Sequence, residues 1–293
     1  MKRTIATVSA ALLLTACNAG LAPATLTPTA APSVTPTPVP LAARVNGEGI
    51  LLADFLEETT RFEAAQGTLG TDLATLGDYQ GDVLQALIDR KLLAQGATSR
   101  GHLVDEAAVE AQLEALAELR GSSEAMGAWL AENAYTLDSF KRALQEDMLA
   151  EWMAEEISRP VGEAAEQSRA AHILVATKQE ADALLAELAT GANFADLAWV
   201  RSLDASTRPS GGDLGWSPQG YLLVPEVDAA VWAIAPGETS DVIESALGYH
   251  IVRVLERGVQ PLSPDAARFV RAQAIRGWLE AERASAQIEI LAP

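Results

Sequence analysis

The chain has 293 residues, of which 49% are hydrophobic, and this is enough material for more than one folded domain. Acidic residues outnumber basic residues by 40 to 21, so the formal net charge at pH 7 is -19. Such a charge argues against nucleic acid as a partner and against adhesion to anionic lipid through basic patches. The simplest interpretation is a solvated acidic surface, and unfolded or basic polypeptide remains the partner class that the charge favours.

Residues 1–17 have the features of a signal peptide. Two basic residues precede a run of about a dozen mostly apolar residues, which is too short to span a bilayer of ~30 Å. The sequence LTAC, which ends at Cys17, resembles the lipobox of bacterial lipoproteins, and Cys17 is the only cysteine of the chain. We therefore expect Cys17 to be lipidated and the protein to be anchored to a membrane outside the cytoplasm. The alternative is an ordinary secretory signal that happens to contain a cysteine.

A linker is predicted for residues 18–41. Six of the fourteen prolines lie between Leu21 and Pro40, interleaved with threonine. This composition favours extended polyproline II and supplies no core, so the segment is expected to act as a stalk.

Residues 42–160 have the periodicity of helices. Apolar residues spaced three and four apart form stripes from Leu52 to Phe62 and from Val83 to Leu92, while Asp105 and Thr136 are suited to cap two further helices. At the far end, Ser263 followed by Pro264 predicts the start of another helix within residues 262–293.

In residues 168–258 the spacing of apolar residues is no longer that of helices alone. HILV and GYHIVRVL are typical of strands, TKQE at 177–180 is a capping box, and a second helix is expected from Asn193 to about Val200. The predicted fold class is therefore α+β. A small antiparallel sheet with flanking helices is expected to be inserted into an all-helical domain, because the C-terminal helix can then pack on helices that precede the insertion.

Two of the three histidines lie in the strand-like segments that begin and end this module. His250 shares a face with Val252 and Val254 on a period of two, which places a titratable ring in apolar surroundings. If the two strands are neighbours, His172 and His250 can meet and fix each other's tautomers. The alternative is a pair of core histidines with satisfied hydrogen bonds and no further role.

The module resembles a parvulin-type peptidyl-prolyl isomerase domain. Seven segments carry the resemblance in order: AHILV (171–175), GANFADLA (191–198), SLDAS (202–206), GGDLGW (211–216), VPEV (224–227), PGETSDVIES (236–245) and GYHIVRV (248–254). The resemblance implies a catalytic set and a proline-binding set, namely His172, Asp204 and His250, and Leu214, Leu223, Val227, Ser245 and Leu247. Where the family commonly has Met and two Phe, this chain has Leu223, Val227 and Leu247, so the proline pocket is expected to lack aromatic walls.

Prolyl isomerisation needs no nucleophile and no cofactor, because its barrier of ~18–20 kcal/mol arises from amide resonance. The two histidines are therefore expected to orient groups and stabilise the rotated amide, with Asp204 tuning them. No metal is expected, since His172, His250 and Asp204 lack a helical ligand spacing or a His-Glu motif. Only Lys178 is available as a basic residue after HILV, which disfavours a phosphate-directed specificity.

The helical segments resemble the chaperone domains of SurA and PrsA type foldases, carried by residues 44–55, 83–101 and 136–153. A plain helical bundle is the alternative to a client-binding domain. The resemblance implies a lipid-anchored isomerase and chaperone whose partners are unfolded or newly exported polypeptides with Xaa-Pro bonds. Two other functions stay open: a holdase whose parvulin-like domain is weak or inactive, and an assembly lipoprotein that docks one partner. The sequence determines neither the clients nor the oligomeric state.

Overall fold

The computed structural model describes residues 39–292. The expected signal peptide, the expected lipidation site Cys17 and nearly all of the expected linker lie outside the described residues. Within the described part of the chain, no helix is both long enough and apolar enough to cross a membrane.

Helices account for most of the described chain between residues 39 and 158. They are α1 (Leu52–Leu69), a short 3-10 helix (Leu73–Thr75), α2 (Tyr79–Ser99), α3 (Glu106–Leu119), α4 (Ser123–Glu132) and α5 (Leu137–Ser158), and α9 (Pro264–Ser285) follows much later. The last of these packs against α2 and α5, so residues from both ends of the described chain share one core.

The predicted helix starts are confirmed at the level of individual hydrogen bonds. The side chains of Asp105, Thr136 and Ser263 each accept a backbone N–H in the first turn of the helix that follows. Thr177 and Glu180 form the predicted capping box at the start of α6. Each cap satisfies an N–H that has no partner within its own helix, which explains why these helices begin where they do.

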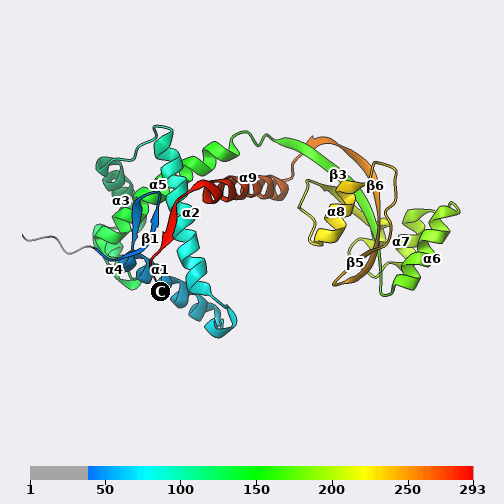
Figure 1. The fold of residues 1–293 in the computed structure, drawn as a ribbon, viewed down its shortest axis with the longest axis horizontal. Helices are drawn as coiled ribbons and strands as arrows, with labels where there is room; N and C mark the ends of the chain where they lie inside the picture. The colour runs from blue at the N-terminus through cyan, green and yellow to red at the C-terminus, as the bar shows by residue number, and fades with distance from the viewer. Residues whose placement is uncertain (1–38, 293) are drawn as a thin grey trace, which may run out of the picture. The chain divides into compact units, whose positions relative to one another are not determined.

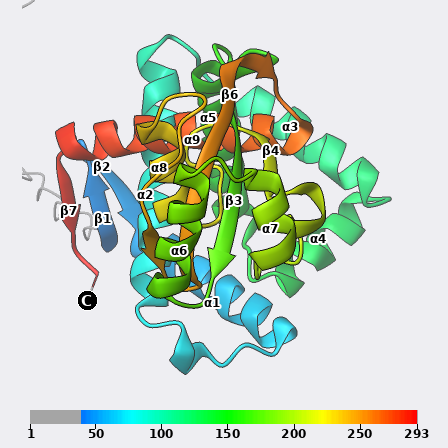
Figure 2. The same ribbon diagram turned by 90° about the vertical axis from the view of Figure 1, so that its right-hand side faces the viewer.

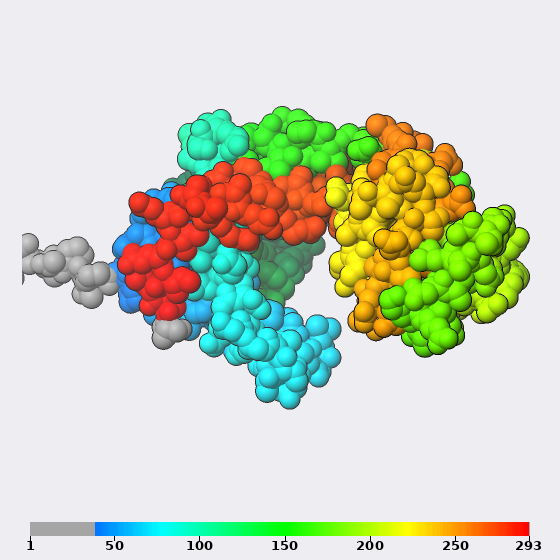
Figure 3. Space-filling view, turned by 45° about the vertical axis from the view of Figure 1, so that its right-hand side comes forward, coloured from blue at the N-terminus to red at the C-terminus, as the bar shows by residue number. Residues whose placement is uncertain are grey.

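The domain that was expected to be all-helical also contains a three-stranded antiparallel sheet. Its strands are β1 (Leu41–Val45), β2 (Glu48–Leu51) and β7 (Ile288–Ile290), in the order β2-β1-β7. These strands lie side by side in Figure 1, and in Figure 3 the red C-terminal surface adjoins the blue surface of the first described residues. Residues 43–50, ARVNGEGI, are strand-like in sequence, but the three residues of β7 are too few to show a strand period.

A second sheet organises residues 164–261, with the strand order β4-β3-β6-β5. Its strands are β3 (Ala164–Val175), β4 (Asp213–Ser217), β5 (Ile243–Ser245) and β6 (Gly248–Pro261). The two longest strands, β3 and β6, pair antiparallel along their whole length and run side by side in Figure 2. The helices of this part are α6 (Lys178–Ala189), α7 (Phe194–Arg201) and α8 (Pro225–Ala233), with a 3-10 turn at Arg208–Ser210.

The alternation of side chains in β3 and β6 supplies two separate apolar clusters, one on each face of this sheet. Ile173 and Ile251 belong to the first cluster, which α6 and α7 cover. Ala170, Val252 and Val254 belong to the second cluster, to which α8 contributes. The predicted α+β class is confirmed, and both histidines of interest lie on the face of the second cluster because successive strand residues point to opposite faces.

Candidate active site

The pairing of β3 with β6 brings His172 and His250 together. His172 is opposite Val252 and His250 is opposite Leu174, so the two histidines are diagonal neighbours on one face of the sheet. Their Nδ1 atoms lie 3.4 Å apart and their ring centroids 5.6 Å apart. The juxtaposition that the sequence predicted is therefore present in the structure.

Asp204 reaches the pair from the loop after α7. Its Oδ2 atom lies 2.7 Å from His172 Nε2 and 2.5 Å from Thr207 Oγ1, while its Oδ1 atom accepts from the backbone N–H and the hydroxyl of Ser206. Ser202 anchors this loop to the sheet, because its Oγ atom accepts from the backbone N–H groups of both Leu174 and Asp204.

Ser245 completes the network at its other end. Its Oγ atom lies 2.7 Å from His250 Nε2 and accepts the backbone N–H of Leu247 at 3.1 Å. The sequence resemblance placed Ser245 in the proline pocket, whereas the structure shows that it contacts the histidine pair directly.

The carboxylate of Asp204 determines the direction of every hydrogen bond in this network. Because an ionised carboxylate only accepts, His172 donates through Nε2, which leaves Nδ1 of a neutral His172 ring as an acceptor. His250 then donates through Nδ1 to His172, and its Nε2 accepts the proton of Ser245. The series of hydrogen bonds therefore runs from Ser245 through both histidine rings to Asp204.

Burial and hydrogen bonding set the charge states of the two ends. Burial, and secondarily the neighbouring His172, lower the pKa of His250, which is completely inaccessible to solvent. Partial desolvation opposes ionisation of Asp204, but hydrogen bonds from Ser206, Thr207 and His172 outweigh it and hold the pKa of this carboxyl well below its usual range. The site thus combines a neutral buried ring with an ionised carboxylate.

Gly212 holds the backbone of the site in place. It accepts the N–H of His172 through its carbonyl at 2.9 Å, and its φ of +82° lies in the left-handed region that favours glycine. A Cβ atom at this position would lie only 2.2 Å from the carbonyl oxygen of His172. The glycine in GGDLGW therefore allows the turn to approach the strand that carries His172.

The apolar surroundings match the expected proline-binding set only in part. Val227 is buried in the second cluster and Leu214 packs against it, as does Leu222, which sequence reasoning missed. Leu223 is 99% exposed and Leu247 is 64% exposed, and neither belongs to this cluster. The chain passes through a loop before α8, where a choice between two adjacent leucines cannot be read from periodicity.

The described residues contain no group of three or more His, Cys, Asp or Glu side chains arranged to hold a metal ion. What the arrangement offers instead is a directional hydrogen-bond network beside an apolar surface. Such a site can stabilise a redistribution of charge without forming a covalent bond to its ligand.

Comparison with known families assigns both parts of the chain. Residues 156–258 match the PPIC-type PPIase domain, and residues 19–154 match the SurA-like N-terminal domain. The chain combines a PPIC-type PPIase domain with a SurA-like N-terminal domain. The PPIase domain includes β3 to β6 and the whole histidine network, and the resemblance to parvulin-type, SurA and PrsA type proteins is confirmed.

Two relatives show the extent of the similarity. Chaperone SurA of Nitrosospira multiformis is 38% identical in a match of 142 residues that covers 42% of this chain and 32% of that protein. Foldase protein PrsA of Caldanaerobacter subterraneus subsp. tengcongensis is 28% identical in a match of 236 residues that covers 72% of this chain and 72% of that protein. The chain spans about a third of the length of the SurA chaperones that it matches.

Solved structures with similarity include a PrsA peptidylprolyl isomerase from Bacillus anthracis. It is 23% identical, and the similar region covers 69% of this chain and 96% of that one with a TM-score of 0.44.

Proposed function

We propose that the chain is a peptidyl-prolyl cis-trans isomerase and chaperone that assists the folding of exported polypeptides. The observation that supports this most directly is the network of Ser245, His250, His172 and Asp204 on the apolar face of the sheet. The PPIC-type and SurA-like family matches, and relatives named as a foldase and as a chaperone, support the same activity.

The network suits this reaction because isomerisation rotates an amide bond and breaks none. Rotation removes the amide resonance behind a barrier of ~18–20 kcal/mol, so the charge on the carbonyl oxygen and the prolyl nitrogen changes during the reaction. His172 and His250 are proposed to present oriented dipoles to the rotating amide, and Asp204 is proposed to fix the tautomer of His172. Oriented groups stabilise the twisted amide more than either planar form, because they need no reorganisation during rotation.

The proline ring is proposed to rest on the apolar side chains beside the network. Leu214 and Val227 supply buried or partly buried surface, while the exposed Leu223 and Leu247 are available to a bound polypeptide. All four are aliphatic, so none of them offers the aromatic contacts that add ~0.5–1.5 kcal/mol beyond area burial. We expect weak binding of short peptides for this reason.

A substitution at His250 tests the activity. His250→Ala is expected to reduce the isomerisation rate of an Ala-Xaa-Pro peptide, measured by NMR exchange spectroscopy, while circular dichroism verifies that the domain is folded. His102→Ala is the matched control, because His102 stacks on Trp152 with a centroid distance of 4.4 Å and lies outside the PPIase domain. An unchanged rate in a folded His250→Ala protein would refute the assignment.

The exposed, aliphatic side chains of Leu223 and Leu247 also support a second candidate function, which is a holdase that binds unfolded clients with little or no turnover. Suppression of client aggregation without acceleration of any Xaa-Pro peptide would favour the holdase. The third candidate, an assembly lipoprotein with one dedicated partner, would be favoured if affinity purification returned a single stoichiometric protein.

The proposed domain organisation places an isomerase insertion (168–258) within a helical domain formed by 42–160 and 262–293. Pairing of β1 with β7, and packing of α9 on α2 and α5, support this division. Anchoring through Cys17 to a membrane outside the cytoplasm is proposed from the lipobox-like sequence alone. Incorporation of labelled fatty acid into the wild-type chain, and its loss in Cys17→Ser, would test the anchor.

A further inference from the structure

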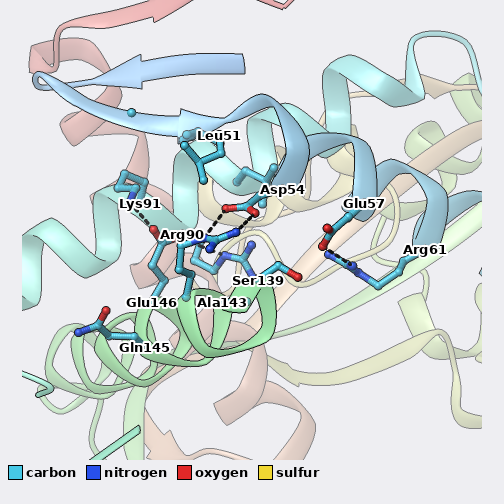
Figure 4. A pocket seen from close by; sticks show the side chains of 14 residues that line it. Leu51, Asp54, Glu57, Arg61, Arg90, Lys91, Ser139, Ala143, Gln145 and Glu146 are labelled. Carbon is cyan, nitrogen blue, oxygen red and sulfur yellow. Dashed lines mark hydrogen bonds and ion pairs between the residues drawn. The ribbon is translucent and has the colours of Figure 1, made fainter. Parts of the chain in front are cut away.

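A polar pocket lies in the helical domain, and none of the residues that line it belongs to the histidine network. It has a volume of about 320 Å³ and is formed by β2, α1, α2 and α5. This volume is at the lower end of the range of ~300–1,000 Å³ that is typical of ligand sites. Four cations and three carboxylates line it: Arg61, Arg90, Lys91, Arg142, Asp54, Glu57 and Glu146. Figure 4 labels all of these except Arg142.

Each of the four cations already has an acidic partner. Arg142 pairs with Asp54 and Lys91 with Glu146, while Arg61 pairs with Glu58 at 2.7 Å and Arg90 with Asp147 at 3.0 Å. An anionic ligand would have to compete with these carboxylates, and a cationic ligand would have to compete with the four cations. The charges therefore favour a neutral polar ligand.

Two buried polar atoms of the pocket residues make no hydrogen bond within the described chain. They are the acceptor Glu57 Oε2 and the donor Arg90 Nε, and the nearest ion-pair contact of each is 3.8 Å long. Unpaired buried polar atoms are costly and rare in folded proteins. Both atoms are inaccessible to solvent, so Glu57 and Arg90 must turn toward the pocket before they bond to a ligand. A ligand that offers one N–H and one C=O then matches this pair of unmet requirements.

The rim of the pocket also contains backbone N–H and C=O groups that can form further hydrogen bonds. Gly49, Ile50 and Leu51 belong both to the pocket lining and to β2, which is an edge strand because β1 is its only neighbour in the described sheet. An edge strand presents backbone N–H and C=O groups that can pair with one more strand. With a rise of ~3.3 Å per residue, the four residues of β2 offer an edge of ~13 Å.

We propose that this pocket binds an extended segment of unfolded polypeptide through its main chain. The segment adds to the free edge of β2, and Glu57 and Arg90 receive an amide N–H and a carbonyl oxygen. Recognition of main-chain amides requires no particular client sequence, and the apolar side chains of Leu51, Leu87 and Ala143 tolerate small client side chains. This inference rests on the proposed chaperone function, for which it names a binding mode and a site in the helical domain.

The test uses the full chain and a proline-free octapeptide of alanine, serine and valine, compared with the same peptide N-methylated at alternate residues. Hydrogen exchange is expected to slow at the backbone amides of residues 48–51 with the first peptide only, because N-methylation removes the N–H groups that pair with an edge strand. Glu57→Met is expected to weaken binding at least about tenfold, equivalent to ~1.4 kcal/mol. Glu156→Met, on α5 but outside the pocket, is the matched control.

Equal binding of the N-methylated peptide, or an absence of protection at residues 48–51, would overturn the proposal. The comparison of the two peptides needs no variant and is therefore decisive even if Glu57→Met fails to fold. The isomerisation rate of an Ala-Xaa-Pro peptide should be the same in wild type and Glu57→Met. If the wild-type chain does not accelerate isomerisation of the Ala-Xaa-Pro peptide, that result counts against the proposed function. If only the comparison of the two octapeptides fails, the result counts against this site alone.

Discussion

Ser245→Ala provides the sharpest test of the directional hydrogen-bond network. Ser245 donates its only hydroxyl proton to Nε2 of His250, whose ring is completely inaccessible to solvent. Removing the hydroxyl leaves a buried acceptor without a donor, and such a loss costs about 1–3 kcal/mol. Ser245 has two other partners, and both should add little: the backbone N–H of exposed Leu247 can bond to water, and the carbonyl oxygen of Gly248 lies at the long distance of 3.4 Å from the hydroxyl.

We therefore expect Ser245→Ala to lower the free energy of unfolding of the PPIase domain by about 1–3 kcal/mol. Urea unfolding, followed by a probe within this domain, measures the change. Nitrogen-15 NMR of the histidine rings should show wild-type His250 protonated on Nδ1 and His172 on Nε2, and a less uniform tautomer of His250 in the variant.

Ser206→Ala is the matched control, because Ser206 also bonds to the network but is exposed, so water can replace its hydroxyl. Its effect should stay within about 0.5 kcal/mol. An equally small effect of Ser245→Ala, together with an Nε2-protonated His250 in the wild type, would contradict the direction assigned to the network.

Three further predictions concern the same site. In thermal unfolding, Gly212→Ala should destabilise the PPIase domain clearly more than Gly191→Ala does. Both glycines have a positive φ, but only at Gly212 would a Cβ atom lie 2.2 Å from the carbonyl oxygen of His172. Asp204→Asn should slow isomerisation by about tenfold or more in a peptide assay, because a hydrogen bond to a charged group is worth ~1.5–3 kcal/mol; an unchanged rate would remove Asp204 from the mechanism. Folding lowers the pKa of His250, so as the pH falls the unfolded chain takes up this proton before the folded chain does. His250 should therefore lower the free energy of unfolding only as the pH falls below ~6.5. Urea titrations should show that loss in the wild type and a weaker one in His250→Gln, whereas Asp204, whose pKa is also lowered, should add a loss only below about pH 4.

The elements with strong local signals could be predicted from the sequence. Caps such as Asp105 and Thr136 act through side-chain contacts within one turn, so they can be read without knowledge of the fold. The approach of His172 to His250 required more than periodicity, because two strands 78 residues apart must be known to pair. The resemblance to parvulin-type domains supplied that information.

Other features of the fold depend on tertiary contacts that leave no local pattern in the sequence. The helix α8 was not predicted, because it has only nine residues and one of them is Asp228, which is buried while it accepts the N–H groups of Gly220 and Leu222. The exposure of Leu223 and the burial of Leu222 are set by this loop geometry rather than by spacing. Strand β7 depends on a partner near residue 44, more than 240 residues earlier.

The pairing of β1 with β7 has a consequence for the order of folding. All strands and helices of the PPIase domain lie between residues 164 and 261, so the ribosome releases that domain before β7 and most of α9. Domains generally fold as units during synthesis, whereas contacts between distant residues form late because closing a long loop costs entropy. The helical domain must therefore hold β1 with one edge unpaired until β7 has been synthesised, and the enclosed PPIase domain can be native by then.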